Sequence, residues 1–143
     1  MRRIGITGGI GSGKSVVSRL LRIMGYSVYD TDSEAKRLME SSLEVVQKLS
    51  ECFGRDIYHN GRLNRGLLSS RVFGESDKIV LLNSIVHPVV RFDFYRWSES
   101  LNEEICFVES AILYESRFDE LVDEVWTVTA PEELRISRVR QRS

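Results

Sequence analysis

The sequence predicts an α/β fold, in which a parallel sheet lies between layers of helices, and three observations lead to this class. A short apolar strand at residues 4–6 runs into a glycine-rich turn and then into a stretch with apolar residues at helical spacing. A second short strand follows at residues 26–29, which makes the beginning of a β-α-β unit. Further apolar runs at residues 104–110 and 124–129 are typical of strands of the same sheet.

The turn after the first strand has the pattern of a phosphate-binding loop. Gly8, Gly13, Lys14 and Ser15 match G-x-x-x-x-G-K-[ST]. Backbone N–H groups must wrap a polyphosphate closely, and a Cβ would hold them away from it, so the loop needs glycine. Lys14 is then expected on the β- and γ-phosphates, and the Ser15 hydroxyl on Mg²⁺. The pattern therefore predicts a nucleotide site, with an incidental glycine turn as the alternative.

Composition limits the partners that the chain can have. The net charge of -1 gives no electrostatic reason to expect nucleic acid or an anionic membrane. Glycines interrupt the apolar residues behind the basic N-terminus, which argues against a signal peptide, and no stretch has the length of a membrane span. Cys52 and Cys106 lack a C-x-x-C partner and are expected to be free, buried thiols. We therefore expect a cytoplasmic protein.

Two carboxylates mark the end of the second strand, in Asp30-Thr31-Asp32. Ligands bind at the carboxyl edge of an open α/β sheet, beside the phosphate loop. We expect these two carboxylates to point to opposite sides of the strand end and therefore to differ in role. Asp32 either caps the following helix or receives the proton of a hydroxyl that accepts a phosphoryl group.

Residues 33–102 are dominated by helical patterns, interrupted by an Asn60-Gly61 turn. This excursion is too long for one crossover helix, so we expect an inserted subdomain over the ligand edge of the sheet. His87-Pro88 is expected to mark a break between two helices. On the local sequence alone, Arg62, Arg65, Arg71 and His87 are better explained by structure than by ligand binding.

Beyond the excursion, the strand at residues 104–110 ends in Glu109, a position suited to binding a Mg²⁺ water. The last helix opens at Ala130-Pro131 and carries Arg135, Arg138 and Arg142 on one face. Cations near a helix C-terminus are common, but such a face could also hold a migrating phosphoryl group.

Six segments, which span nearly the whole chain in the same order, together resemble the dephospho-coenzyme A kinase family: Thr7–Ser15, Asp30–Asp32, Phe53–Gly54, Gly61–Arg65, Leu82–Pro88 and Ile112–Glu115. The resemblance implies a P-loop kinase fold in three layers. It implies a nucleotide-binding core with the start of a lid at residues 1–32 and 103–143, and a helical acceptor subdomain at residues 33–102. Family members continue beyond this point with the rest of the lid, a further strand and a helix, so an incomplete lid is expected here.

The same resemblance implies transfer of the ATP γ-phosphate to the 3′-hydroxyl of dephospho-CoA, the last step of coenzyme A biosynthesis, with Mg²⁺. It assigns Asp32 as catalytic base, Lys14, Arg138 and Arg142 as further catalytic residues, and Asp32, Arg65 and His87 to the acceptor. The metal residues are Ser15 and, through water, Glu109. The expected ATP site consists of Gly9, Ile10, Gly11, Ser12, Gly13, Lys14, Ser15 and Val16.

Two other functions remain as alternatives at this point. One is a kinase for another nucleoside or nucleotide, and the other is an ATP-binding module without turnover. A GTPase switch is disfavoured because the chain has no Asn-Lys-x-Asp and no Asp-x-x-Gly after the loop. We expect a monomer, with an oligomer as the alternative.

Overall fold

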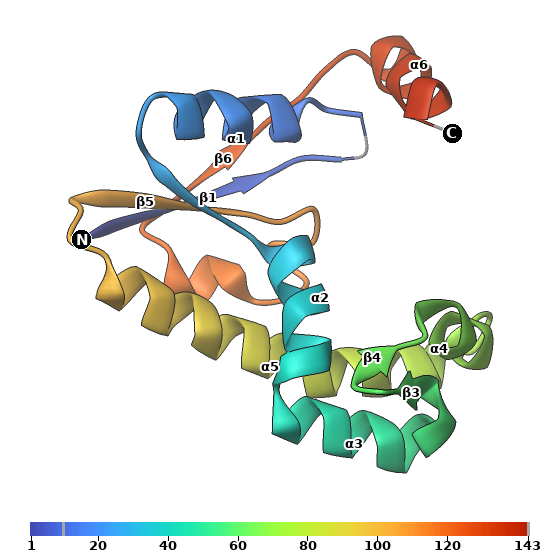
Figure 1. Ribbon diagram of the computed structural model, residues 1–143. Coiled ribbons are helices and arrows are strands. Elements are labelled where there is room, and N and C mark those ends of the chain that lie inside the picture. The colour runs from blue at the N-terminus through green and yellow to red at the C-terminus, as the bar shows by residue number, and fades with distance from the viewer. Residues whose placement is uncertain (10, 143) are drawn as a thin grey trace. The chain divides into compact units, whose positions relative to one another are not determined.

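The computed structural model describes residues 1–9 and 11–142, apart from the side chains of five residues in the last helix. The chain forms two compact units (Figure 1). Met1–Thr31 and Phe94–Ser143 make up the core unit, and Asp32–Asp93 make up the inserted unit. The sequence predicts an insertion over residues 33–102, and the inserted unit of the structure is Asp32–Asp93. Its end at Asp93 falls within a long helix that continues into the core unit.

The core unit contains four strands and the helices that flank them. Its strands are β1 (Arg2–Thr7), β2 (Ser27–Asp30), β5 (Ile105–Glu109) and β6 (Glu124–Thr127). Its helices are α1 (Lys14–Ile23), the 3₁₀ helix η2 (Phe118–Leu121) and α6 (Glu132–Arg142), together with the end of α5 (Ser76–Ser100). All strand pairs are parallel, in the order β2-β5-β1-β6. The predicted parallel sheet is therefore confirmed.

The sheet is covered on both faces, which gives the core unit three layers. On one face Leu21 of α1 packs with Ile4, Ile6, Val28 and Phe107. On the other face Phe94 at the end of α5 contacts Tyr29 and Phe118, with ring centroids 5.4 and 5.7 Å apart. Figure 1 shows α1 and the end of α5 on opposite sides of the strands.

Helix α1 has a glycine with positive φ next to each of its ends. Gly13, with φ 100°, precedes α1, and Gly25, with φ 98°, follows it. The Gly25 N–H donates to the Arg22 carbonyl and the Tyr26 N–H to the Leu21 carbonyl, which is a Schellman termination. The apolar stripe of this helix is only partly packed, because Val16, Leu20 and Met24 are exposed.

The inserted unit consists of helices around a small hairpin. It contains α2 (Thr31–Ser41), which starts one residue earlier, α3 (Leu43–Phe53), the 3₁₀ helix η1 (Arg55–Ile57), β3 (Tyr58–His59), β4 (Arg62–Leu63), α4 (Arg65–Val72) and the first part of α5. Its buried side chains include Val45, Leu49, Ile57, Leu63 and Leu68. The hairpin turns at Asn60 and Gly61, with φ 51° and 78°, as a two-residue turn of this composition should.

The break expected at His87-Pro88 is wrong, because α5 is one helix of 25 residues with Pro88 inside it. Proline removes the hydrogen bond to the carbonyl four residues earlier and costs about 3 kcal/mol in a helix interior. Ile85, Val86 and Val90 are buried on either side of it. Burial of several such side chains, at about 1.5–3 kcal/mol each, outweighs the cost of the proline.

The structure also bears on the expectations for the two cysteines and for membrane spans. Both cysteines are free, but only Cys106 is buried, and the expectation of a buried Cys52 is wrong because this residue is exposed. In the described part of the chain, no helix combines the length and the apolar character that crossing a membrane requires.

Truncating Phe94, which contacts Tyr29 and Phe118 on the α5 face of the sheet, should destabilise the folded protein. Phe94 is fully buried, so Phe94→Ala is expected to lower the free energy of unfolding by about 3–5 kcal/mol. Phe92 is two residues earlier on the same helix and 62% exposed, so Phe92→Ala should change it by less than about 1 kcal/mol. Urea unfolding of the two variants compares them, and equal losses would contradict this packing.

Candidate active site

The glycine-rich loop joins β1 to α1 and has the backbone that anion binding needs. Gly11 and Gly13 have φ of 75° and 100°, a conformation that L side chains rarely adopt. The Ser12 N–H donates to the Gly9 carbonyl at 3.1 Å, and the N–H groups of Val16 and Val17 donate to the Gly13 carbonyl. The loop therefore delivers the chain into the first turn of α1, whose N-terminus attracts anions.

Gly8 is required by close packing rather than by its dihedral angles. A Cβ at this position would meet the Ser12 hydroxyl and would lie 2.6 Å from the Val128 carbonyl oxygen. The Ser12 Oγ is buried and has no hydrogen-bond partner among the described residues. A buried hydroxyl without a partner is costly, so this atom is suited to a ligand oxygen that enters the loop.

Ser15 in the first turn of α1 and Glu109 at the end of β5 approach each other. The Ser15 Oγ lies 3.5 Å from Glu109 Oε1, and Glu109 is 7% exposed. Thr31 Oγ1 donates to the Glu109 carbonyl at 2.7 Å, which holds the end of β5. Among the described residues, the contact with Ser15 is the only hydrogen bond of this buried carboxylate. A buried carboxylate needs a cation or donors, so this pair fits a hydrated Mg²⁺.

The metal would take few ligands from the protein. Within the described residues, no group of three or more His, Cys, Asp or Glu side chains could hold an ion. Mg²⁺ at nucleotide sites keeps several waters and takes other oxygens from the phosphates. A hydroxyl and one nearby carboxylate are consistent with that kind of binding.

Lys14 is the cation that this loop offers to a ligand. Its side chain is half-buried, and no described residue forms a hydrogen bond or an ion pair with it. An ammonium group without a protein partner is suited to a phosphate oxygen.

Asp32 belongs to the inserted unit, where it lies in the first turn of α2. The expectation that Asp30 and Asp32 point to opposite sides of a strand is wrong. Residues two apart in a strand share a face, and here β2 ends at Asp30 and the helix begins at Thr31. The Asp32 carboxylate is 81% exposed and lies 3.3 Å from the Lys36 ammonium, one turn further along the helix. It is therefore accessible to a substrate and next to a positive charge.

The two predicted acceptor residues also lie in the inserted unit. Arg65 begins α4, and its guanidinium donates to the Lys36 carbonyl at 3.1 Å and to the Glu40 carboxylate at 3.4 Å. His87 is half-buried in α5, and its burial, followed by the nearby Arg91, lowers the pKa of the imidazole. His87 is therefore neutral near pH 7 and can offer a hydrogen bond but not a charge.

The remaining predicted residues lie partly outside the described part of the chain. Ile10 is outside it altogether. Arg138 and Arg142 lie in α6, but their side chains are also outside the description. The structure therefore leaves their predicted roles as predictions.

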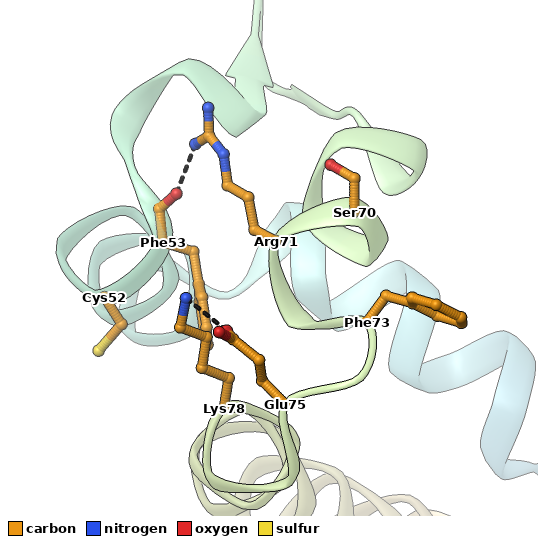
Figure 2. A pocket seen from close by; sticks show the side chains of 7 residues that line it. All are labelled: Cys52, Phe53, Ser70, Arg71, Phe73, Glu75 and Lys78. Atoms are coloured by element: carbon orange, nitrogen blue, oxygen red, sulfur yellow. Dashed lines mark hydrogen bonds and ion pairs between the residues drawn. The ribbon is translucent and has the colours of Figure 1, made fainter.

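A hollow of about 390 Å³ in the inserted unit is a poor phosphate site. Figure 2 shows Arg71 bound to the Phe53 carbonyl and Lys78 paired with Glu75, while the ring of Phe73 extends away from them. Arg71 also forms two hydrogen bonds of 2.6 Å with Asp56. Both cations of the hollow are thus neutralised by partners in the protein.

Lys36 and Thr31 were missed by the sequence analysis as site residues. The spacing of Asp32 and Lys36, four apart in a helix, could have indicated their ion pair. The contact between Thr31 and Glu109 joins residues 78 apart in the sequence, and no local pattern indicates it.

Comparisons with known proteins find matches that cover nearly the whole chain. A family model described as dephospho-CoA kinase matches residues 2–143. A protein named dephospho-CoA kinase from Porphyromonas gingivalis is 47% identical over 142 residues, which cover 99% of this chain and 70% of the relative. A crystal structure of a Thermus thermophilus protein matches with a TM-score of 0.84 and 37% identity, over 99% of this chain and 72% of the other. A dephospho-CoA kinase from Campylobacter jejuni, 17% identical with a TM-score of 0.62 over 99% of this chain and 95% of the other, shares the fold.

Gly8→Ala should weaken ATP binding, because its Cβ cannot fit against the Val128 carbonyl without moving the loop. We expect a loss of roughly tenfold or more, which corresponds to about 1.4 kcal/mol of misplaced contacts. Isothermal titration of ATP measures it. Gly66→Ala is the control, since its Cβ would come no closer than 3.6 Å to Asn64 Oδ1. Equal ATP affinity in the two variants would contradict the close packing at Gly8.

The lowered pKa of His87 should make the stability depend on pH. Because the folded pKa lies below the ordinary value of 6.5, the unfolded chain takes up the proton first as the pH falls. Stability is therefore full above about pH 6.5 and declines as the pH falls from that value to the folded pKa. His87→Asn should show a shallower decline over this range in urea unfolding. An unchanged slope would exclude His87 as its source.

Proposed function

Because the chain belongs to the dephospho-CoA kinase family, we infer that it transfers the γ-phosphate of ATP to the ribose 3′-hydroxyl of dephospho-CoA, the last step of coenzyme A biosynthesis. The observation that carries this inference is the family match over residues 2–143, which includes both the phosphate loop and the inserted unit. A kinase for another acceptor and an ATP-binding module without turnover are not favoured, because the relatives that match the whole chain carry the name of this enzyme.

ATP is proposed to bind with its phosphates in the loop of Gly9–Val16. The backbone N–H groups of the loop and the N-terminus of α1 supply donors, and Lys14 supplies a charge that no described residue neutralises. In phosphoryl transfer the protein contributes mainly positioning and electrostatic stabilisation. The role of this loop is therefore to hold the polyphosphate and to spread the charge of the migrating group.

Ser15 and Glu109 are proposed to hold Mg²⁺, the first through its hydroxyl and the second through a bound water. The separation of 3.5 Å between these two side chains supports the proposal, together with the burial of the carboxylate. The ion would neutralise charge on the β- and γ-phosphates. Thr31 keeps Glu109 in place through its hydrogen bond to the backbone.

Asp32 is proposed as the base that receives the proton of the acceptor hydroxyl. As the 3′-oxygen bonds to the γ-phosphorus, the bond from that phosphorus to the leaving ADP oxygen breaks, and the hydroxyl proton passes to the Asp32 carboxylate. Its exposure and its place in the first turn of α2 support this role. The Lys36 ammonium lies 3.3 Å from this carboxylate and pairs with one of its oxygens.

The remaining roles rest on the family alone. Arg65 and His87 are proposed to contact dephospho-CoA, and Arg138 and Arg142 to contact the ATP phosphates from α6. We also propose a monomer in the cytoplasm.

Asp32→Asn should lower kcat by roughly 10²- to 10⁴-fold, the range of general-base catalysis, while ATP still binds. A coupled assay of ADP release with dephospho-CoA measures the rate. Glu44→Gln is the matched control, because Glu44 is also an exposed acid paired with a lysine four residues later, at 2.9 Å from Lys48. Full activity of Asp32→Asn would remove Asp32 from the mechanism.

Acceptor choice is tested by competition. Dephospho-CoA should be phosphorylated in preference to adenosine, AMP or shikimate at equal concentration. Product analysis by mass spectrometry would place the new phosphate on the ribose 3′ position. A preference for another acceptor would overturn the proposed substrate but leave the nucleotide site intact.

A further inference from the structure

The C-terminal half of α2 is held by two side chains, Tyr58 from β3 of the hairpin and Arg65 from the start of α4. The Tyr58 hydroxyl donates to the Met39 carbonyl at 2.6 Å. Arg65 donates to the Lys36 carbonyl at 3.1 Å and contacts Glu40 at 3.4 Å. Met39 is one of the last residues of α2, and carbonyls at this end of a helix have no partner within it. The Tyr58 hydroxyl therefore provides a bond that the helix itself cannot make.

Tyr58 lies in the hairpin, and Arg65 follows the hairpin in the sequence after Asn64. Tyr58 pairs with Leu63 across the two strands, and the Asn64 N–H donates to the Ile57 carbonyl at 2.6 Å. Ile57 and Leu63 are buried, so the base of the hairpin is anchored in the core of the inserted unit. The C-terminal end of α2 is thus bonded to a hairpin whose base is buried.

We propose that Tyr58 is a positioning residue for phosphoryl transfer. By holding the C-terminal end of α2, Tyr58 fixes the position of this helix along the helix axis, and with it the position of Asp32 in the first turn. This proposal rests on the proposed function, in which Asp32 receives the acceptor proton. An α-helix is stiff along its axis, so a shift at Met39 moves the first turn as well. Misplacement of a catalytic group by about 1 Å can cost on the order of 10² in rate.

The surroundings of Tyr58 keep its hydroxyl protonated, so that it can donate a hydrogen bond. Burial and then the nearby Glu40 raise the pKa of Tyr58 to about 12, with Arg65 acting in the opposite direction. The hydroxyl therefore remains protonated at any pH at which the enzyme would be assayed. It can hold the Met39 carbonyl throughout the reaction and takes no part in proton transfer.

The test is Tyr58→Phe, which removes the hydroxyl and keeps the ring. Two rates are measured on the same preparation, phosphoryl transfer to dephospho-CoA and ATP hydrolysis without an acceptor. We expect transfer to fall by roughly tenfold at every pH from 6 to 9, with hydrolysis and the KM for ATP within twofold of wild type. The ratio of transfer to hydrolysis therefore falls, whereas simple unfolding would lower both rates together.

Two controls separate positioning from general destabilisation. Val72→Ala trims a buried side chain of the same unit on α4, and it should lower stability without changing the ratio. Tyr95→Phe makes the same chemical change on a partly exposed ring that contacts Arg3, and it should leave both rates unchanged. In an Asp32→Asn background, Tyr58→Phe should cause no further loss of transfer.

Each outcome decides the role of Tyr58. An unchanged ratio in Tyr58→Phe, or a full additional tenfold loss in the Asp32→Asn background, would overturn the positioning role and leave the proposed function standing. A wild-type protein that binds ATP but phosphorylates no dephospho-CoA would instead overturn the proposed function, and this proposal with it.

Discussion

The parallel pairing of β1 with β5 is the constraint that brings the glycine-rich loop and Glu109 together. Ile6 pairs with Glu109, so the loop that leaves β1 and the carboxylate that ends β5 reach the same edge of the sheet. The Ser110 N–H donates to the Ile6 carbonyl at 2.9 Å and the Val128 N–H to the Thr7 carbonyl at 2.8 Å, which extends both ladders past the strand ends. The approach of Ser15 to Glu109 depends on this register.

The candidate residues of the two units are held in different ways. In the core unit the loop is formed by backbone, and close packing at Gly8 leaves no room for a side chain. In the inserted unit, side-chain contacts hold the candidate residues. Asp32 pairs with Lys36, and Arg65 donates to the Lys36 carbonyl in the middle of the same helix. Backbone donors suit a polyphosphate common to many enzymes, whereas side chains can be adapted to one acceptor.

The sequence was sufficient for the sheet, the loop and the family, because these depend on local patterns. The glycine spacing and the apolar run before Glu109 are such patterns. Pro88 was misleading because its local penalty is overcome by burial along the helix, which the sequence does not display. The contacts of Thr31 with Glu109 and of Tyr58 with Met39 join distant residues, and only tertiary packing brings them together.

The strand order also determines when the sheet can form during synthesis. In the order β2-β5-β1-β6, Arg2 pairs with Ile105 and Ile4 with Glu124. At roughly 5–20 residues per second, β1 leaves the ribosome several seconds or more before either neighbour exists. The hairpin and short helices of the inserted unit need only nearby partners and can form in that interval. The apolar residues of β1 must therefore stay shielded in the nascent chain until its partner strands emerge.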